Sequence, residues 1–204
     1  MNYCKILINA RDGIQMKKEI LLSYLENLFT ESDIIELKEC LHQDDIVLEG
    51  KKQKPLYLNG IEELFSQIQI ILSPELVYAI STGICTNGMY DVLKEFLIKI
   101  YFKIKNVLIT KMHSGGKSEK VSPTIHFIIG ETKVVLPTDM DEEKYKYFVD
   151  KFFESIKSEG VEKKEYCIWN EGKGEIEYYS KQEIVRKIYL ERNNKEETKW
   201  QNYH

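Results

Sequence analysis

The sequence predicts an α+β fold, with a mixed or antiparallel sheet of short strands, a central helical segment and about six helices in all. Apolar residues recur at helical spacing within 61–105 and again within 141–157. Short apolar runs separated by glycine turns dominate the C-terminal part. The 11 Gly, 4 Pro and 4 Cys exclude collagen-like, disordered and disulfide-scaffold proteins.

The N-terminal part is expected to alternate strands and a helix. An apolar run over 3–9 predicts a buried strand, and Asp12 is suited to cap a helix over about 14–29. Two short strands are expected at 34–38 and 45–48, which is compatible with a parallel crossover. An exposed turn is expected at 51–55.

The central segment is expected to be helical. Asn59 and Glu62 resemble a capping box for a helix whose apolar face extends to Leu72. The pair Ser73-Pro74 predicts the start of a short helix. A third helix over about 88–105 is apolar around most of its circumference. Such a helix lies either in the centre of the core or at an interface, so a homo-oligomer built on 88–105 is left open.

The C-terminal part predicts two hairpins and two helices. The runs 124–129 and 132–136 flank Gly130-Glu131, which is a hairpin pattern. An amphipathic helix follows over about 141–157, and a second hairpin pairs 166–169 with 175–179. Ser180 and Glu183 form a capping box for a last helix ending near Arg192.

Two domain organisations are compatible with these elements. An N-terminal α/β plus helical segment, 1–110, is followed by a C-terminal hairpin-helix-hairpin-helix segment, 123–204. Alternatively, 1–192 forms one domain with a flexible 111–122 loop. The strand at 106–110 is equally well interpreted as the tail of the preceding helix.

Charge and composition narrow the classes of partner. The formal net charge is −4, distributed as −5 over 1–50, +4 over 51–120 and −3 over 121–204. An acidic chain is a poor match to a phosphate backbone, so nucleic acid is an unexpected partner. Charges recur too often for a membrane span. Dispersed cysteines and the absence of a signal peptide favour a cytoplasmic protein, and the Lys-rich, Ala-poor composition favours a microbial source.

The motif search finds no nucleophile elbow, dinucleotide loop or metal-ligand spacing, so no cofactor and no metal are expected. Gly116-Lys117-Ser118 resembles the end of a phosphate-binding loop but leads into a strand. Arg11 follows the first expected strand and Asp44-Asp45 could form half of a carboxylate site. Arg11, Lys117 and the two aspartates are therefore candidate binding residues.

Aromatic residues gather in the C-terminal hairpin, where Trp169 and Tyr178 are candidate binding residues. Exposed aromatic side chains are typical of protein interfaces. The alternative is that this hairpin packs its aromatic residues against the 141–157 helix.

These observations favour a non-catalytic partner-binding protein of a microbial cell, such as an immunity, inhibitor or defence-accessory protein. Its acidic and aromatic surface groups would complement a protein partner, and the acidic charge favours a basic one. The alternative is a nucleotide- or anion-binding enzyme or sensor, in which Arg11, Lys111 and Lys117 supply positive charge and Asp44 or Asp45 acts as acid or base.

Overall fold

The computed structural model describes residues 17–42, 44–53, 67–82, 87–112, 118–138, 140–159, 166–170, 172–180, 182–187, 189 and 190. Its elements in chain order are β1 (Lys18–Leu25), α1 (Glu31–His42), β2 (Ile46–Gln53), β3 (Ile68–Leu72), α2 (Pro74–Ser81), α3 (Asn87–Ile104), β4 (Ile109–Met112), β5 (Ser118–Val121), β6 (Ile125–Ile129), β7 (Thr132–Leu136), α4 (Glu142–Glu159), β8 (Tyr166–Asn170) and β9 (Glu175–Tyr179). Residues 182–187, 189 and 190 are also helical. The predicted α+β fold with a mixed sheet is confirmed.

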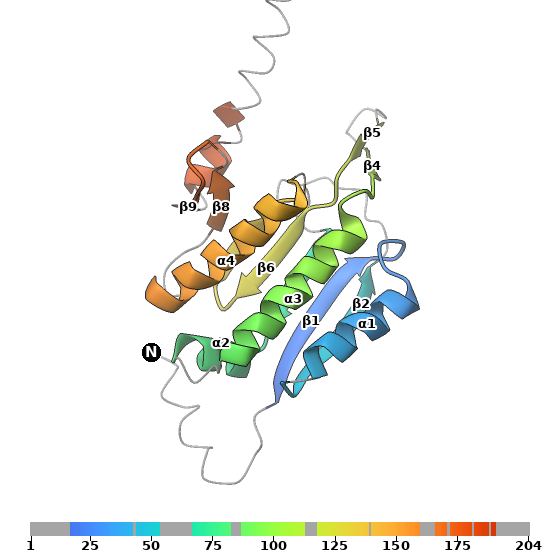
Figure 1. The fold of residues 1–204 in the computed structure, drawn as a ribbon. Coiled ribbons are helices and arrows are strands. Elements are labelled where there is room, and N and C mark those ends of the chain that lie inside the picture. Colours follow the sequence, from blue (N-terminus) through green and yellow to red (C-terminus); the bar gives the residue numbers. More distant parts are fainter. Residues whose placement is uncertain are drawn as a thin grey trace, which may run out of the picture.

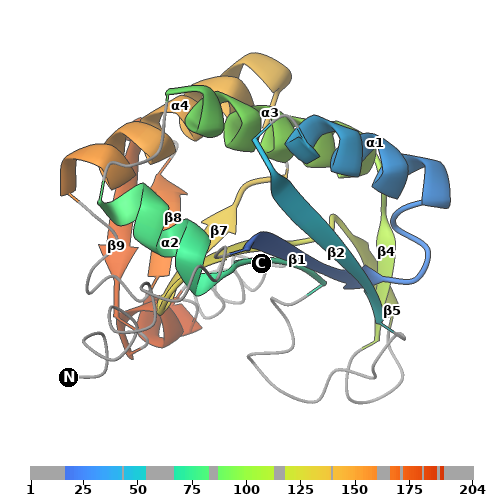
Figure 2. The same cartoon turned by 90° about the horizontal axis from the view of Figure 1, so that it is seen from below.

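Seven strands form one mixed sheet in the order β2-β1-β3-β6-β7-β8-β9. Three pairs of neighbours are parallel, namely β1 with β2, β3 with β6, and β7 with β8. Parallel neighbours need a crossover connection, and α1, α2 with α3, and α4 lie in these three connections. Helices α1, α3 and α4 cover one face of the sheet, with α3 in the middle (Figures 1 and 2).

The core lies between the sheet and these helices. Alternate residues of β1, β3 and β6 are buried against the helical layer, as Ile20, Ile70 and Phe127 illustrate. Helix α3 buries nine apolar residues: Met89, Tyr90, Val92, Leu93, Phe96, Leu97, Ile100, Tyr101 and Ile104. The expectation that this helix lies in the centre of the core is therefore confirmed, and an oligomer built on 88–105 stays a prediction.

Two of the expected N-terminal elements are wrong. Residues 18–25 form β1 instead of the predicted helix over 14–29, because this segment pairs with β2 on one side and β3 on the other. Residues 34–38 belong to α1 instead of a strand. Thr30 and Asp33 exchange hydrogen bonds as a capping box, and the helix buries Leu37 and Leu41.

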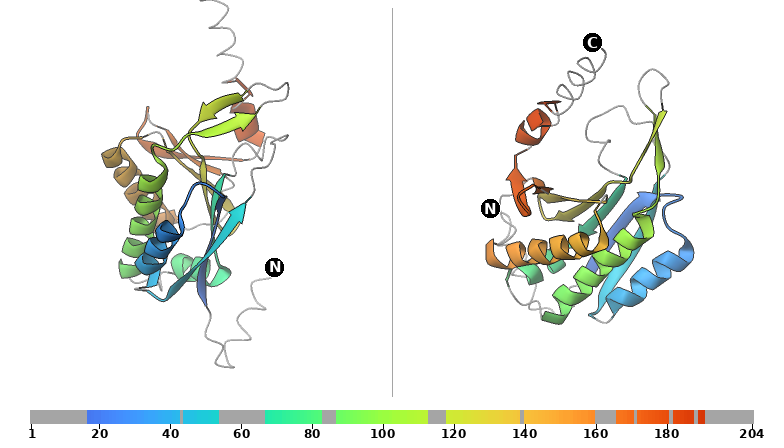
Figure 3. Two further views of the ribbon diagram at one scale, coloured as in Figure 1. Left: turned by 90° about the vertical axis from the view of Figure 1, so that its right-hand side faces the viewer. Right: turned by 45° about the horizontal axis from the view of Figure 1, so that its top comes forward.

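Three further boundaries differ from the sequence prediction. Residues 68–72 form β3 between β1 and β6 instead of the end of a helix, and the rest of that predicted helix lies outside the described residues. Residues 51–53 extend β2 instead of forming a turn. The expected 111–122 loop contains β5 and the end of β4, which pair as a hairpin that extends from one end of the sheet (Figure 3). The expected strand over 3–9 lies outside the described residues.

Predictions that rest on local signals are confirmed. Ser73 caps α2 and accepts a hydrogen bond from the Leu76 backbone N–H. Gly130 and Gly174 have positive φ angles of 59° and 64° in the β6–β7 and β8–β9 turns. The Ser180–Glu183 capping box is present, with hydrogen bonds in both directions.

Candidate protein-binding surface

Large hydrophobic side chains that remain exposed gather toward the C-terminal part of the described chain. Ten such side chains are exposed among the described residues, and five of them come from α4 or later segments: Tyr147, Tyr178, Val185, Tyr189 and Leu190. These five residues lie on two surfaces, one associated with each face of β9. We call Tyr147, Trp169 and Tyr178 the aromatic flank, and Val185, Tyr189 and Leu190 the C-terminal helix face.

The aromatic flank lies where α4 packs on β8 and β9, the segments coloured orange and red in Figure 1. The half-buried Trp169 ring contacts Phe148 edge-on, with 5.6 Å between ring centroids. The exposed Tyr147 ring also contacts the Trp169 ring, with 6.1 Å between the ring centroids. The indole therefore packs against the helix, as one of the two sequence interpretations proposed, and Tyr147 extends the aromatic surface into solvent.

Polar contacts hold the exposed tyrosines of the flank in place. The Tyr178 hydroxyl forms a hydrogen bond with the Ser155 hydroxyl on α4. The Lys151 ammonium lies 5.6 Å from the Tyr147 ring centroid and 2.8 Å from a Glu154 carboxylate oxygen. An aromatic side chain with few rotatable bonds loses little entropy when a partner covers it.

Glu177 is the centre of a hydrogen-bond network on the face of β9 opposite to Tyr178. Its carboxylate accepts hydrogen bonds from the Tyr179 hydroxyl, from Asn170 Nδ2 at 2.7 Å and from Lys173 Nζ at 2.9 Å. These donors, with Tyr179 the largest contributor, lower the pKa of Glu177 to about 2. Lys187 Nζ lies 2.8 Å from the Tyr179 hydroxyl and 3.6 Å from Glu177, so the network fastens the last helical segment to β9.

The last helical segment presents the C-terminal helix face. Its capping box begins at Ser180, and Ile184 is buried and anchors the segment. Val185 and Tyr189 are four residues apart and thus lie on one side of the helix. Their side chains are 40% and 64% exposed, and Leu190 beside them is 51% exposed. The segment therefore carries an apolar face that the described chain does not bury.

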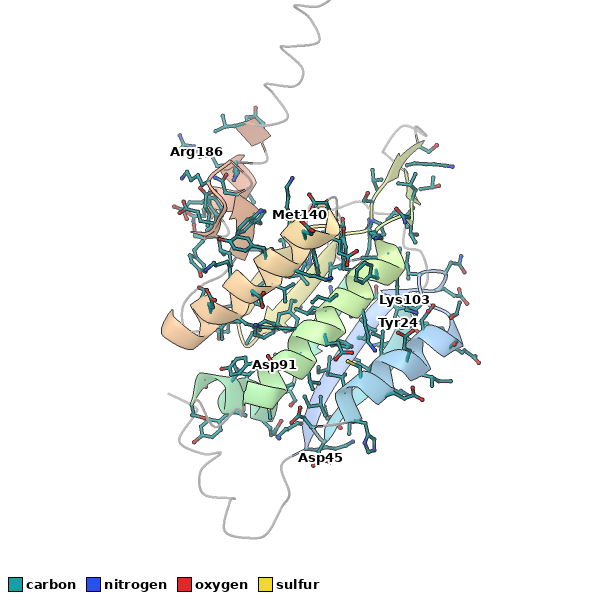
Figure 4. The ribbon with its side chains drawn as sticks, in the orientation of Figure 1. Tyr24, Asp45, Asp91, Lys103, Met140 and Arg186 are labelled. Carbon is teal, nitrogen blue, oxygen red and sulfur yellow. The ribbon has the colours of Figure 1, made fainter. Side chains whose placement is uncertain are left out.

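The other candidate binding residues do not join this surface. Asp44 and Asp45 form the turn between α1 and β2, where Asp45 has a φ of 56° that aspartate tolerates better than most residues. Asp45 lies at the bottom of the molecule in Figure 4, whereas β8 and β9 lie at the upper left in the same orientation (Figure 1). Arg11 and Lys117 lie outside the described residues.

Cys40 and His126 are buried side chains, and burial is the main cause of the pKa shift of each. Burial, followed by the nearby Glu95 carboxylate, raises the pKa of the Cys40 thiol to about 11. Burial, followed by the charge of Lys133, lowers the pKa of His126 to about 3. Across the described part of the chain, no three His, Cys, Asp or Glu side chains gather as a metal site would require.

Comparison with protein-family models, with curated proteins and with solved structures finds no match for this chain. No helix in the described ranges has the length and apolar character needed to cross a bilayer.

Sequence reasoning selected Trp169 and Tyr178 but missed Tyr147, Val185, Tyr189 and Leu190. A signal for Tyr147 exists, because it is an aromatic residue outside the apolar stripe of its helix, between the buried Tyr145 and Phe148. Val185 and Tyr189 show the corresponding four-residue spacing in the last helix. Whether these side chains are exposed follows only from the tertiary structure, which shows which faces of the helices pack against the sheet.

Proposed function

We propose that this protein is a non-catalytic binding protein that recognises another protein through its C-terminal part. The observation that carries this proposal is the gathering of exposed apolar and aromatic side chains on the C-terminal helix face and the aromatic flank. Tyrosine and tryptophan are enriched among the residues that dominate binding energy in interfaces.

The mode of action that fits such a surface is occlusion of a partner, as inhibitors and immunity proteins achieve. A short helix with an apolar face is suited to a hydrophobic groove of the partner, with anchors at positions i and i+4. Val185 and Tyr189 have this spacing. The surrounding Lys187 and Glu183 would form the polar rim of such an interface.

The test first recovers a stoichiometric partner from native lysate and identifies it. The affinity of that partner for each variant is then measured. The double variant Val185→Ser/Tyr189→Ser removes two anchors of the C-terminal helix face. Ile35→Ser/Val47→Ser is the control, because these two hydrophobic side chains are similarly exposed but lie on α1 and β2. We expect the first variant to weaken binding by about tenfold or more, and the control to bind like the wild type.

Two outcomes contradict the proposal. One is a partner that binds the Val185→Ser/Tyr189→Ser variant as tightly as it binds the wild type. The other is the absence of any stoichiometric partner together with a rise in Tm on adding nucleotides or divalent metals, which supports the alternative of a nucleotide- or anion-binding enzyme or sensor.

A further inference from the structure

Among the described residues, the sheet ends in two edge strands, β2 and β9, whose side chains protect the edge against further pairing to different extents. Each pairs with one neighbour within the described part of the chain, β2 with β1 and β9 with β8. An edge strand presents unpaired N–H and C=O groups, and lysine is the residue that most often blocks further pairing. Strand β2 carries exposed Lys51 and Lys52, whereas β9 has the sequence Glu-Ile-Glu-Tyr-Tyr, with neither lysine nor proline.

Strand β9 divides its side chains between two faces. Ile176 and Tyr178 lie opposite Trp169 and Cys167 of β8 and share the face that α4 covers. Glu175, Glu177 and Tyr179 lie on the other face. In an antiparallel pair, residues directly opposite each other point to the same side of the sheet. A second antiparallel strand at this edge therefore places an apolar or aromatic residue beside Tyr178, the exposed member of this face.

We propose that the strand occupying this edge is β9 of a second copy of the chain, paired about a two-fold axis at Tyr178. This inference rests on the proposed protein-binding role of the C-terminal part and assigns the aromatic flank to self-association. The C-terminal helix face then remains for the other partner. The paired edges join the two seven-stranded sheets into one continuous sheet.

The charges of β9 select this register. Three two-fold registers pair at least three residues of β9 with each other. Centring on Ile176 places Glu175 opposite Glu177, and centring on Glu177 places two copies of that carboxylate opposite each other. Like charges in directly opposite positions are destabilising. Centring on Tyr178 instead places Glu177 opposite Tyr179 and the two Tyr178 rings opposite each other.

This register also adds a favourable charge contact. Lys187 Nζ already lies 2.8 Å from the Tyr179 hydroxyl. Because Tyr179 would lie opposite Glu177 of the second copy, each Lys187 would stand beside a second carboxylate. The surface is thus self-complementary, as a two-fold interface requires.

The exposed tyrosines acquire a role in the same arrangement. Neighbouring strands lie about 4.8 Å apart, so both α4 helices come to cover the same face near the junction. Tyr147, which contacts Trp169 of β8, and Tyr178 on β9 are 51% and 36% exposed in one chain. Their burial between the two helices would supply apolar area in addition to the strand pairing.

The first test is the oligomeric state of the full chain, measured by light scattering and sedimentation from low to high micromolar concentration. We expect a mass of about twice the 24.1 kDa of one chain. Tyr178→Lys, which places two lysines opposite each other, should return the monomer. Val47→Lys at the β2 edge is the matched control and should leave the dimer intact, while circular dichroism verifies that both variants fold.

The second test reports the register. Opposite residues in an antiparallel pair have Cα atoms within disulfide distance. Tyr178→Cys should therefore form a covalent dimer on mild oxidation, whereas Glu175→Cys and the wild type should not. A wild-type monomer at every concentration overturns the inference, as does a dimer that survives in a folded Tyr178→Lys variant. Val185→Ser/Tyr189→Ser should remain dimeric. A dimer without any other partner would therefore contradict only the proposed function, and a partner bound to a monomer would contradict only the dimer.

Discussion

The two ends of the sheet are built from different interactions. At the β2 end, charges fasten α1 to α3, since Lys103 Nζ lies 2.7 Å from Asp33 and 2.6 Å from Glu36. At the β9 end, aromatic rings fasten α4 to the strands, with Trp169 against Phe148 and Tyr147. Charged side chains line the surface at the first end, whereas the aromatic side chains of Tyr147 and Tyr178 remain exposed at the second.

The contrast teaches that exposure of an apolar side chain carries more information when the local contacts hold that side chain in one position. Ile35 and Val47 are exposed singly at the β2 end, which is ordinary for a folded protein. Tyr147 and Tyr178 are exposed beside a packed indole and are held by Lys151 and Ser155. The second arrangement is the one expected of a recognition surface.

The largest predicted effect is that of Phe148→Ala on the β9 end. Phe148 is fully buried and contacts Tyr145, Phe152 and Trp169, so its truncation should lower the free energy of unfolding by about 3–5 kcal/mol. Tyr147→Ala, one residue away but exposed, should cost less than about 1 kcal/mol. Urea unfolding followed by circular dichroism measures both, and equal losses would show that the flank is part of the core.

A change of pH should act on the centre of the sheet and thereby on both ends together. His126 in β6 is 1% exposed, and its pKa is about 3 when folded against 6.5 for the unfolded chain. Below pH 6.5 the unfolded chain binds a proton that the folded chain does not. Stability should therefore fall by up to about 1.4 kcal/mol per pH unit between pH 6.5 and 3.

The measurement for His126 is urea unfolding at a series of pH values. His126→Gln should reduce the slope of stability against pH, because it removes the titrating group. A wild-type slope that persists in His126→Gln would assign the pH dependence to other groups.

The smallest predicted effect is that of Lys103→Met at the β2 end. Lys103 contributes most to lowering the pKa of Asp33 from 3.8 to about 2. The variant should raise the pKa of Asp33, measured by NMR titration, and lower stability by about 0.5–1 kcal/mol at low salt. Lys51→Met on the neighbouring edge strand should change neither quantity. An unaltered Asp33 titration in Lys103→Met would contradict the charge-based account of this end.

Local signals in the sequence predicted the elements that depend on neighbouring residues. The Ser73-Pro74 start, the Gly130 turn and the Ser180–Glu183 box are all present, because caps and turns are made by residues within a few positions. Helix α4 was predicted for a similar reason, since its apolar stripe repeats over four turns.

Elements whose partners are distant in sequence were predicted less well. The segment 18–25 has apolar spacing that suits either a helix or a buried strand. Its position between β2 and β3 decides in favour of the strand, and those pairings are invisible to local reasoning. Thr30 and Asp33 did carry a capping signal for α1, which the short apolar run over 34–38 obscured.

The sequence by itself determined the α+β class, the caps of α2 and of the last helical segment, the glycine turns and the aromatic content of the last hairpin, because short-range geometry follows from residue type. Only the tertiary structure decided that β9 ends the sheet, that Trp169 packs beneath Tyr147, and that the α4 end differs from the α1 end. These features depend on the order of strands across the sheet. That order is set by long-range pairing and burial, for which residue types at short spacing provide no measure.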